Sequence, residues 1–446
     1  MIRLCTVLIA LLSFPLCAVA QQSQNWSWCR AENATPFDLQ VNGCTAIIQS
    51  GQESKQNLAS AYCSRGIAYY NNGQTERAVG DLQQSFKLRS AGADAYRCRG
   101  ISFEATRDYD RALRDYNEAI RLNPKFAEAY SDRGDVYSAQ KNYDRAIAEY
   151  GSAILHSAKP APFHLKRGSM YAKKNEHDKA IADYDRSIAL EPGVARAYSN
   201  RGLAYGAKND PTRAVSDYSE AIRLDPLNTT YRLDRGNAYF AKREWDQALA
   251  DYTKAVEIDP KSAAAYRNRG LVYASKKEND LAIAEYTKAI GLAPRYATAY
   301  FDLGSAYARK GDDDQAIAGY AKAIEIDPTW DEAYRYRGAA YTRKGNFDSA
   351  IADYTKAIEI DPKDANYYNG RAWAYLKAGK AAQGLPDAER SLELRPNDVN
   401  ILNTRGHIFE ALGKREEAIV DFRQALTKDA NHQSSKDALQ RLGAAP

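Results

Sequence analysis

The sequence predicts an all-α protein, an α-solenoid of stacked antiparallel helical hairpins. Two observations predict this fold class. A Gly that follows Arg or Leu recurs every 34 residues, and each interval contains two segments with small and apolar residues at helical spacing. A lone hairpin would leave its apolar face exposed, so each copy must stack on its neighbours. We therefore expect the 446 residues to form one elongated array rather than several globular domains.

The first element is a leader over residues 1–20. It has a basic start at Arg3, an apolar run from Leu4 to Leu16, and small residues ending at Ala20, which is the layout of a cleaved secretory signal. The apolar run is shorter than the ~20 residues that a membrane-spanning helix needs. Lipid attachment at Cys17 is the less favoured alternative, since Leu16 before it is not small. We expect an exported protein, periplasmic or secreted, without an integral membrane segment in the mature chain.

Residues 21–58 are expected to form a cysteine-containing helical cap or a degenerate leading repeat. Removal of the leader leaves four cysteines near the mature N-terminus, Cys29, Cys44, Cys63 and Cys98. Three pairings are open in an oxidising compartment. We favour Cys29 with Cys44 and Cys63 with Cys98, because the first pair would link two short cap helices and the second lies one period plus one residue apart. Metal binding is the alternative, but no CxxC motif or nearby His accompanies these cysteines.

Eleven copies of the repeat follow in one register over residues 59–432. The repeated Gly has ten occurrences, and Ala372 stands in the one remaining place. The ten are Gly66, Gly100, Gly134, Gly168, Gly202, Gly236, Gly270, Gly304, Gly338 and Gly406.

Each copy is expected to be a helical hairpin, as residues 264–294 illustrate. Small and apolar residues share one face in each of two segments, "SKKEND" between them is a polar turn, and Pro294 ends the second helix. Gly270 against Ala282 would let the two backbones approach closely.

These landmarks resemble the tetratricopeptide repeat family, whose small, aromatic and Pro positions are spaced over 34 residues in the same way. Where that family often has Trp at the fourth place of a copy, this chain mostly has Tyr, as at Tyr62 and Tyr266. The resemblance implies a right-handed superhelix. Its concave face would be lined by first helices and would commonly hold an extended or helical peptide.

Two features near the C-terminus depart from the regular pattern. Residues 433–446 offer a short helix that could cap the last hairpin. The tenth copy has Ala372, Gly384, Pro386 and Ala388 at places that other copies fill differently. We expect Pro386 to delay the start of the second helix and to create a soft joint there.

The composition excludes several function classes. Lys and Arg exceed Asp and Glu by only +5, too little for a nucleic-acid-binding surface. The five histidines have no ligand spacing, and no phosphate loop, GxSxG elbow or HExxH motif occurs. We therefore expect no enzyme activity, no catalytic residues, no metal and no cofactor.

The candidate partner-binding residues are those that the family resemblance directs into the groove, at the second, fifth, ninth, twelfth and thirteenth places of each first helix. Acidic residues in copies two and three give way to apolar and then to basic and amide residues. The acidic set is Asp94, Glu104, Glu128 and Asp135. The later set is Leu165, Leu203, Leu233, Phe240, Leu271, Phe301, Arg309, Arg335, Arg343, Asn369, Trp373, Lys377, Asn403 and His407.

This charge gradient suits a polypeptide with opposite charges along its length. Phe240, Phe301 and Trp373 are the preferred anchors, since aromatic side chains often dominate interface energies. Replacing Phe240 and Phe301 with Ser should then leave the melting temperature nearly unchanged. If these apolar residues instead only pad contacts between helices, the protein should unfold.

Two function hypotheses follow. The first is a protein-protein interaction scaffold of the periplasm or cell exterior that binds a peptide or partner protein, in envelope assembly. The alternative is an accessory protein for envelope polysaccharide synthesis or export, with glycan or a polysaccharide synthase as its partner, in which Tyr70, Tyr336 and Trp373 would stack on sugar rings.

One copy, "FDLGSAYARKGDDDQAIAGY" at residues 301–320, lacks two repeated charges. Ten copies have Arg before the Gly and an acid before the second aromatic place, but here Leu303 and Gly319 stand instead. We interpret the repeated pair as an ion pair between the two helices of a hairpin, lost as a unit in this copy. Restoring Arg at 303 and Asp at 319 together should then recover most of the stability that Arg alone would lose.

Overall fold

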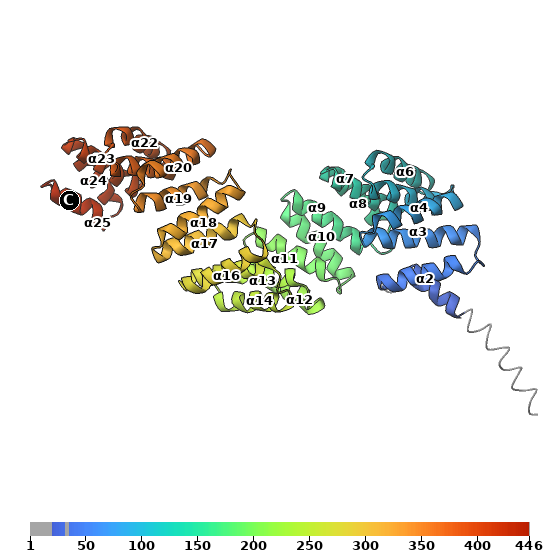
Figure 1. Cartoon of the computed structure of the whole chain (residues 1–446). Coiled ribbons are helices and arrows are strands. Elements are labelled where there is room, and N and C mark those ends of the chain that lie inside the picture. The colour runs from blue at the N-terminus through green and yellow to red at the C-terminus, as the bar shows by residue number, and fades with distance from the viewer. Residues whose placement is uncertain (1–19, 32–34, 446) are drawn as a thin grey trace, which may run out of the picture. The chain divides into compact units, whose positions relative to one another are not determined.

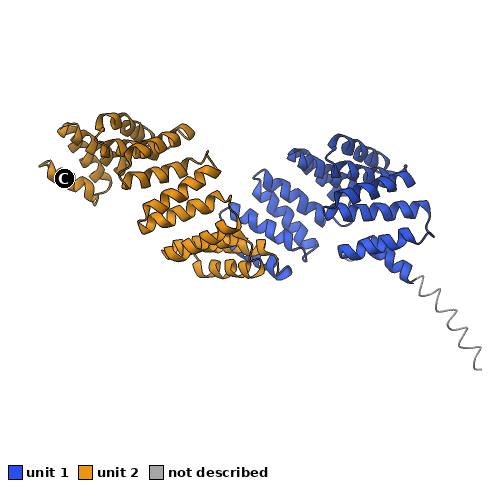
Figure 2. Ribbon diagram, viewed as in Figure 1, with its two compact units in different colours: residues 1–226 blue, residues 227–446 orange. Residues whose placement is uncertain are grey.

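The computed structural model describes residues 20–31 and 35–445, so the expected leader lies outside the described residues apart from Ala20. The described chain is an array of helices in hairpin order, which confirms the all-α fold class (Figure 1). It divides into two units, residues 1–226 and 227–446 (Figure 2), described separately below. Among the described residues, no helix is both long and apolar enough to span a membrane.

The hairpins keep the predicted register from end to end. The first helices are α3 (Lys55–Asn71), α5 (Ala93–Ala105), α7 (Ala127–Ala139), α9 (Ala161–Lys173) and α11 (Ala195–Ala207) in the first unit, and α13 (Thr229–Ala241), α15 (Ala263–Ser275), α17 (Ala297–Lys310), α19 (Asp331–Arg343), α21 (Ala365–Lys377) and α23 (Val399–Ala411) in the second. Their second helices are α4 (Thr75–Leu88), α6 (Tyr109–Leu122), α8 (Tyr143–His156), α10 (His177–Leu190), α12 (Pro211–Leu224), α14 (Trp245–Ile258), α16 (Asn279–Leu292), α18 (Asp313–Ile326), α20 (Phe347–Ile360), α22 (Ala381–Leu394) and α24 (Arg415–Lys428).

The turn inside each hairpin requires a left-handed residue at one fixed place. Gly fills it in five copies, with Gly311 at φ 82° as an example. Six copies place a residue with a side chain there, at φ between 58° and 64°, as at Lys277. Since this region is unfavourable for most residues with a Cβ but tolerated by Asn, local strain is expected in the four turns with Arg or Lys at this place.

The repeated Gly makes room for an aromatic ring and, in several copies, for a close approach to the backbone of the second-helix Ala, as at Gly304 and Ala316. A Cβ on Gly270 would lie 2.7 Å from the ring of Tyr286, which is 1% exposed. The close approach expected of the Gly and Ala places is seen in equivalent copies, where a Cβ on Gly168 or Gly304 would lie 3.2 or 3.0 Å from the carbonyl oxygen of Ala180 or Ala316. The bulky second-helix Tyr packs against the first helix of its own copy, and only Gly leaves space for it.

The predicted ion pair between the helices of a hairpin is confirmed in ten copies. Each Arg contacts its carboxylate at 2.6 to 2.8 Å, and the carboxylate is largely buried, with 2% of the Asp421 side chain exposed. Most are two-pronged, as in Arg337, which donates from Nε and Nη2 to Asp353. The ten bridges are Arg65–Asp81, Arg99–Asp115, Arg133–Glu149, Arg167–Asp183, Arg201–Asp217, Arg235–Asp251, Arg269–Glu285, Arg337–Asp353, Arg371–Asp387 and Arg405–Asp421.

The copy without the bridge is built differently, and the expectation that Asp at 319 would be accepted was wrong. A Cβ on Gly319 would lie 2.8 Å from backbone atoms of Gly304, so the helices meet there by backbone contact. Leu303 packs against the buried cluster that includes Tyr286 and Ala306. A closer helix contact therefore replaces the charged pair.

The tenth copy also departs from the expectation. Helix α22 begins at Ala381, as in regular copies, and contains Pro386 in its interior, so the predicted late start was wrong. The first turn tightens instead, since the Gln383 amide donates to the Lys380 carbonyl three residues back. Ala388 replaces the usual ring, which explains why Ala372 is tolerated in the Gly place. Gly384 then allows close contact with the Ala372 carbonyl, 2.8 Å from the position of an added Cβ.

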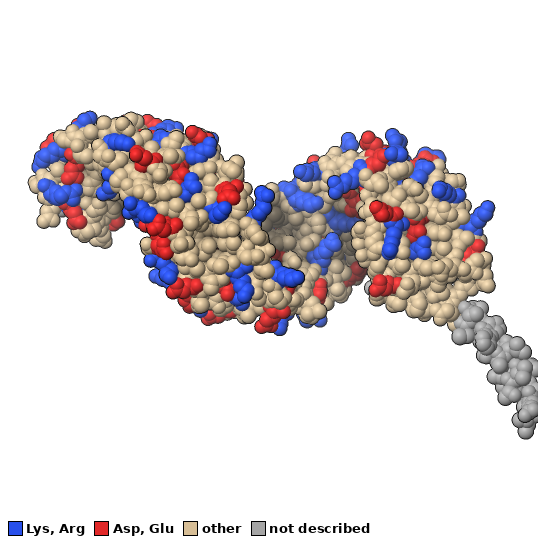
Figure 3. Space-filling view, viewed as in Figure 1, with Lys and Arg blue, Asp and Glu red and all other residues tan. Residues whose placement is uncertain are grey.

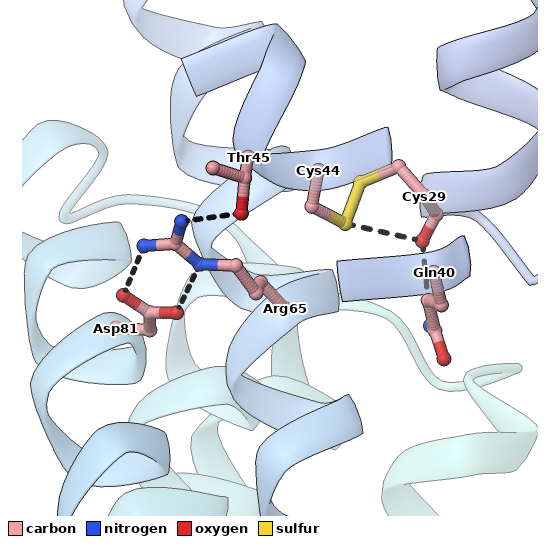
Figure 4. The surroundings of a disulfide bond; sticks show 6 residues. All are labelled: Cys29, Gln40, Cys44, Thr45, Arg65 and Asp81. Atoms are coloured by element: carbon pink, nitrogen blue, oxygen red, sulfur yellow. Dashed lines mark hydrogen bonds and ion pairs between the residues drawn. A yellow bond between two sulfur atoms is a disulfide. The ribbon is translucent and has the colours of Figure 1, made fainter. Parts of the chain in front are cut away.

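A disulfide joins the two helices of the N-terminal segment, and the Arg of the first bridge connects that segment to the array. Residues 21–29 are helical, and Cys29 is bonded to Cys44 of α2 (Phe37–Gln49), both fully buried. Arg65 contacts Asp81 within its hairpin and also donates from Nη1 to Thr45 of α2, at 2.9 Å (Figure 4). The favoured pairing of these cysteines is confirmed.

Helix α25 (Gln433–Arg441) covers the end of the last hairpin. Its Ala438 and Leu439 are fully buried against Ala418, Ile419 and Phe422 of α24. A short C-terminal helix was expected to have this role.

Candidate functional site

The inner side of each unit is formed by its first helices. Successive first helices contact one another, as α17 with α19 and α19 with α21, whereas the described second helices have no comparable contact with each other. Within each unit the first helices therefore lie closer together than the second helices, which agrees with the expected concave face. We call the residues at the second, fifth, ninth, twelfth and thirteenth places of the first helices the groove residues.

Second-helix tyrosines reach this face from behind. The hydroxyls of Tyr150, Tyr252 and Tyr320 contact the ninth-place residues Asp135, Asn237 and Ser305 at 2.7 to 3.2 Å. The rings are buried while the hydroxyls lie among groove residues. A polar row inside the inner face follows from this packing.

In the first unit, Glu104 of the expected acidic end is already bound within the chain. It accepts hydrogen bonds from the hydroxyls of Tyr70 at 2.9 Å and Tyr116 at 2.6 Å. Burial raises the pKa of Glu104 to about 7, opposed by these hydrogen bonds and reinforced by the charges of Asp132 and Asp135.

Asp135 is also satisfied internally. It accepts from Lys166 of the next copy at 2.5 Å and from Tyr150 at 2.7 Å. Burial nevertheless raises its pKa. Asp94 and Glu128, by contrast, are exposed, so these two of the four acidic candidates in the first unit remain open to a partner.

The second disulfide, Cys63 with Cys98, joins α3 to α5 on the inner face and confirms the other favoured pairing. It borders a hollow of about 200 Å³ that also includes Asp94 and Arg97. Arg97 is turned toward Asp132 of the following copy at 2.6 Å.

Of the two leucine candidates in the first unit, Leu203 is largely exposed and Leu165 is not. Leu203 is 51% exposed and lines a hollow of about 260 Å³ together with Ala172, His177 and Tyr184. Leu165 is half-buried against the cluster around Tyr184 and Ala204. Leu203 is therefore the better contact residue.

In the second unit, Leu233, Phe240 and Leu271 are half-buried. Leu233 and Phe240 pack on the cluster of Ala248 and Tyr252, and the Phe240 ring meets Trp245 edge-on with centroids 4.9 Å apart. Leu271 belongs to the cluster that includes Leu303.

Phe301 lies in the middle of an aromatic group. Its ring stacks on Trp330 with centroids 4.6 Å apart and meets Tyr336 edge-on at 5.2 Å and Tyr320 at 5.4 Å. Since Phe240 and Phe301 both fill packing positions, we no longer expect their replacement by Ser to leave the melting temperature unchanged.

The basic groove residues have unequal surroundings. Arg343 makes a two-pronged contact with Asp313 at 2.6 to 3.2 Å, so its charge is compensated. Arg309 donates only to the amide oxygen of Asn279, at 3.2 Å. Arg335 lies over the Tyr336 ring at 4.0 Å, and Lys377 lies over Trp373 at 4.6 Å.

The amide and His candidates are more enclosed. The buried Oδ1 of Asn369 has no hydrogen-bond partner in the described structure. Asn403 and His407 contact Ser435 and Ser434 of α25. Helix α25 thus engages Asn403 and His407 within the chain, which leaves these two candidates less open to a partner.

The sequence reasoning missed residues at the sixth place that face the inner side. Asp132 and Asp302 accept from Arg97 and Arg267 of the preceding copy at 2.6 and 2.7 Å, and Lys166 reaches Asp135. Their 31- to 35-residue spacing with opposite charge was the available signal. Among the described residues, no cluster of His, Cys, Asp and Glu could hold a metal ion.

Basic and acidic side chains are interspersed on the visible surface of each unit, without a large field of one sign (Figure 3). This pattern agrees with the small net charge and gives no support to a nucleic-acid surface.

Family models match most of the array. Models described as TPR repeat match residues 168–209, 236–277, 270–311, 305–345 and 338–379. Models described as tetratricopeptide repeat match residues 99–162, 369–433 and 195–228. No curated protein matches the sequence.

Solved structures with similar arrangements include the APC/C hetero-tetramer Cut9-Hcn1, at 15% identity over 92% of this chain and 94% of that chain, with a TM-score of 0.46. A tetratricopeptide repeat protein from Parabacteroides merdae is 23% identical over 56% of this chain and 98% of its own, with a TM-score of 0.44. MamA is 34% identical over 36% of this chain and 95% of its own, with a TM-score of 0.34.

Proposed function

Because the chain belongs to the tetratricopeptide repeat family, we propose that it is a protein-protein interaction scaffold that binds a polypeptide segment along the first-helix faces of its units. We place it outside the cytoplasm, in the periplasm or at the cell exterior, with a role in envelope assembly. It acts by binding and not by catalysis.

The observation that carries this proposal is that the fifth-place groove residues differ between copies while the Arg–carboxylate bridge is kept. The seventh place is Arg in ten copies and its carboxylate recurs with it, whereas the fifth place changes size and charge from copy to copy. In chain order the fifth-place residues are Cys63, Arg97, Ser131, Leu165, Ser199, Leu233, Arg267, Phe301, Arg335, Asn369 and Asn403. A surface that differs at each step can read a ligand that differs at each step, as a polypeptide does.

The aromatic residues favour a protein over a glycan partner. Sugar stacking is strongest on a ring whose faces are both free, but Arg335 lies over one face of Tyr336, Lys377 lies over one face of Trp373, and the hydroxyl of Tyr70 is held by Glu104. Each residue that the glycan hypothesis needs is thus already engaged within the chain.

Export is supported by the leader and by the disulfides, since such bonds persist in oxidising compartments. Thiol alkylation before reduction tests this directly. We expect Cys29, Cys44, Cys63 and Cys98 to be unmodified in protein isolated from its host. Alkylation of all four would contradict the placement.

Photo-crosslinking in intact cells tests the function. A benzophenone residue at Leu203 or at Arg309 lies on an inner face, and Lys322, exposed on second helix α18, provides the control position. We expect a discrete protein adduct from the two groove positions and none from the control. Recovery of glycan and synthase components alone would instead support the polysaccharide alternative.

A further inference from the structure

We infer that the inner face of α17, α19 and α21 in the second unit binds an acidic segment of a partner protein that carries apolar residues between its carboxylates. This inference rests on the proposed scaffold function and names the chemistry of the partner.

The first argument is that cations on this face lack carboxylate partners. Arg309, Arg335 and Lys377 have no ion pair with an Asp or Glu in the described structure. The Arg residue of each of the ten hairpin bridges, by contrast, has one. Such positive charge is available to an incoming anion.

Two of these cations, Arg309 and Arg335, lie close enough to second-helix tyrosines to affect the pKa of their hydroxyls. Burial raises the pKa of Tyr320, and the charges of Arg343 and Arg309 oppose that rise. Burial likewise raises the pKa of Tyr354, opposed by hydrogen bonding to Thr342 and by Arg335 and Arg343. Arg309, Arg335 and Arg343 therefore lie near the hydroxyls of Tyr320 on α18 and Tyr354 on α20.

Acidic residues are nearly absent from the groove places of these three helices. Glu332 is the one acid among them, while Arg309, Arg335, Arg343 and Lys377 are basic. Asp302, at the sixth place of α17, is engaged by Arg267 at 2.7 Å. Copies two and three, by contrast, have four acids at the corresponding places. The second unit thus has its own positive inner face.

Aromatic rings fix the unpaired cations and add apolar surface. Arg335 and Lys377 rest on Tyr336 and Trp373, which restrains long side chains before a ligand arrives. Tyr336 is 36% exposed and adjoins Phe301. Apolar side chains among the carboxylates of the ligand would contact these rings.

The test uses the full-length chain and a fluorescein-labelled 12-residue peptide of repeating Glu-Glu-Leu, followed by fluorescence anisotropy. A Lys-Lys-Leu peptide of equal length and an unbranched polygalacturonate oligomer are the comparison ligands. The groove variant is R335Q/K377Q. The matched control is K322Q/K356Q, which removes the same charge from exposed positions on α18 and α20, where each Lys pairs with a Glu three residues on.

We expect the acidic peptide to bind, more weakly as salt rises, and the groove variant to reduce its affinity about tenfold while the control variant changes it less than about twofold. Equal losses in the two variants, preference for the Lys peptide, or tighter binding of polygalacturonate would each overturn the inference. Unchanged unfolding temperatures establish that both variants are folded. If protein adducts form at Arg309 but the acidic peptide does not bind, the scaffold function stands and this inference fails.

Discussion

Gly319 of α18 and Gly304 of α17 touch through their backbones, since a Cβ on Gly319 would stand 2.8 Å from both the Cα and the N of Gly304. In the other ten copies an Arg and a carboxylate join the same two helices. The eighth copy therefore joins its hairpin by close packing, and its two sequence departures belong together.

Substitution of Gly319 tests this arrangement. We expect Gly319→Ala to lower the free energy of unfolding by ~1–3 kcal/mol, because the added methyl must displace backbone. Gly319→Asp should be at least as damaging, and Leu303→Arg should not rescue it. Chemical denaturation measures these effects. Gly291→Ala in α16 is the control: its Cβ meets open space, so it should be neutral or slightly stabilising. Recovery of stability in the double variant would refute the close-packing account.

The bridge of a regular copy is tested with Arg337 and Asp353. The Asp353 side chain is only 8% exposed, so removal of Arg337 strands a charge in a nearly buried site. We expect Arg337→Leu to cost ~2–4 kcal/mol, and a double-mutant cycle with Asp353→Asn to give a coupling of ~1–3 kcal/mol. Additive single effects would show that the pair is not an energetic unit.

The left-handed turn residues offer a stabilising change. Lys277 has φ 64°, and its replacement by Gly relieves that strain. We expect Lys277→Gly to raise the free energy of unfolding by ~0.5–1 kcal/mol. Gly345→Ala, at φ 81° in the equivalent turn of copy nine, should change stability in the opposite direction. A destabilised Lys277→Gly variant would contradict this explanation.

Glu104 makes stability of the first unit depend on pH. Burial raises its pKa from 4.5 to about 7 in the folded state, so folding is favoured by protonation. This contribution is complete below pH 4.5 and is lost as the pH rises to about 7. Denaturation of the wild type and of Glu104→Gln from pH 4.5 to 8 measures it. We expect the variant to gain stability relative to wild type as pH rises. Parallel curves would rule out this role for Glu104.

Much of the fold could be predicted from the period. The spacing of Gly, Arg and Pro located the hairpins, and opposite charges 16 residues apart, such as Arg337 and Asp353, indicated the bridge. The Gly and the Arg with its carboxylate each recur ten times, so each copy supports the interpretation of the others.

It was harder to predict which side chains point into the groove and which of them are already bound within the chain, because both depend on contacts between copies. Nothing local to Glu104 shows that Tyr70 and Tyr116 bind it, and nothing local to Asn403 shows that α25 covers it. Likewise the room at Gly319 depends on how far α17 approaches, which two departures in the sequence could not reveal.

The central claim is that the Arg–carboxylate bridges within the hairpins determine stability, while the groove residues determine partner binding. The most direct test measures two quantities for R337L and for R335Q/K377Q. One is the unfolding temperature, and the other is the yield of crosslinked partner from crosslinkers at Leu203 and at Arg309. We predict that R335Q/K377Q keeps the wild-type unfolding temperature but loses most of the adduct formed at Arg309, and that R337L unfolds at a lower temperature. A lowered unfolding temperature with unchanged adduct yield in R335Q/K377Q would contradict the claim.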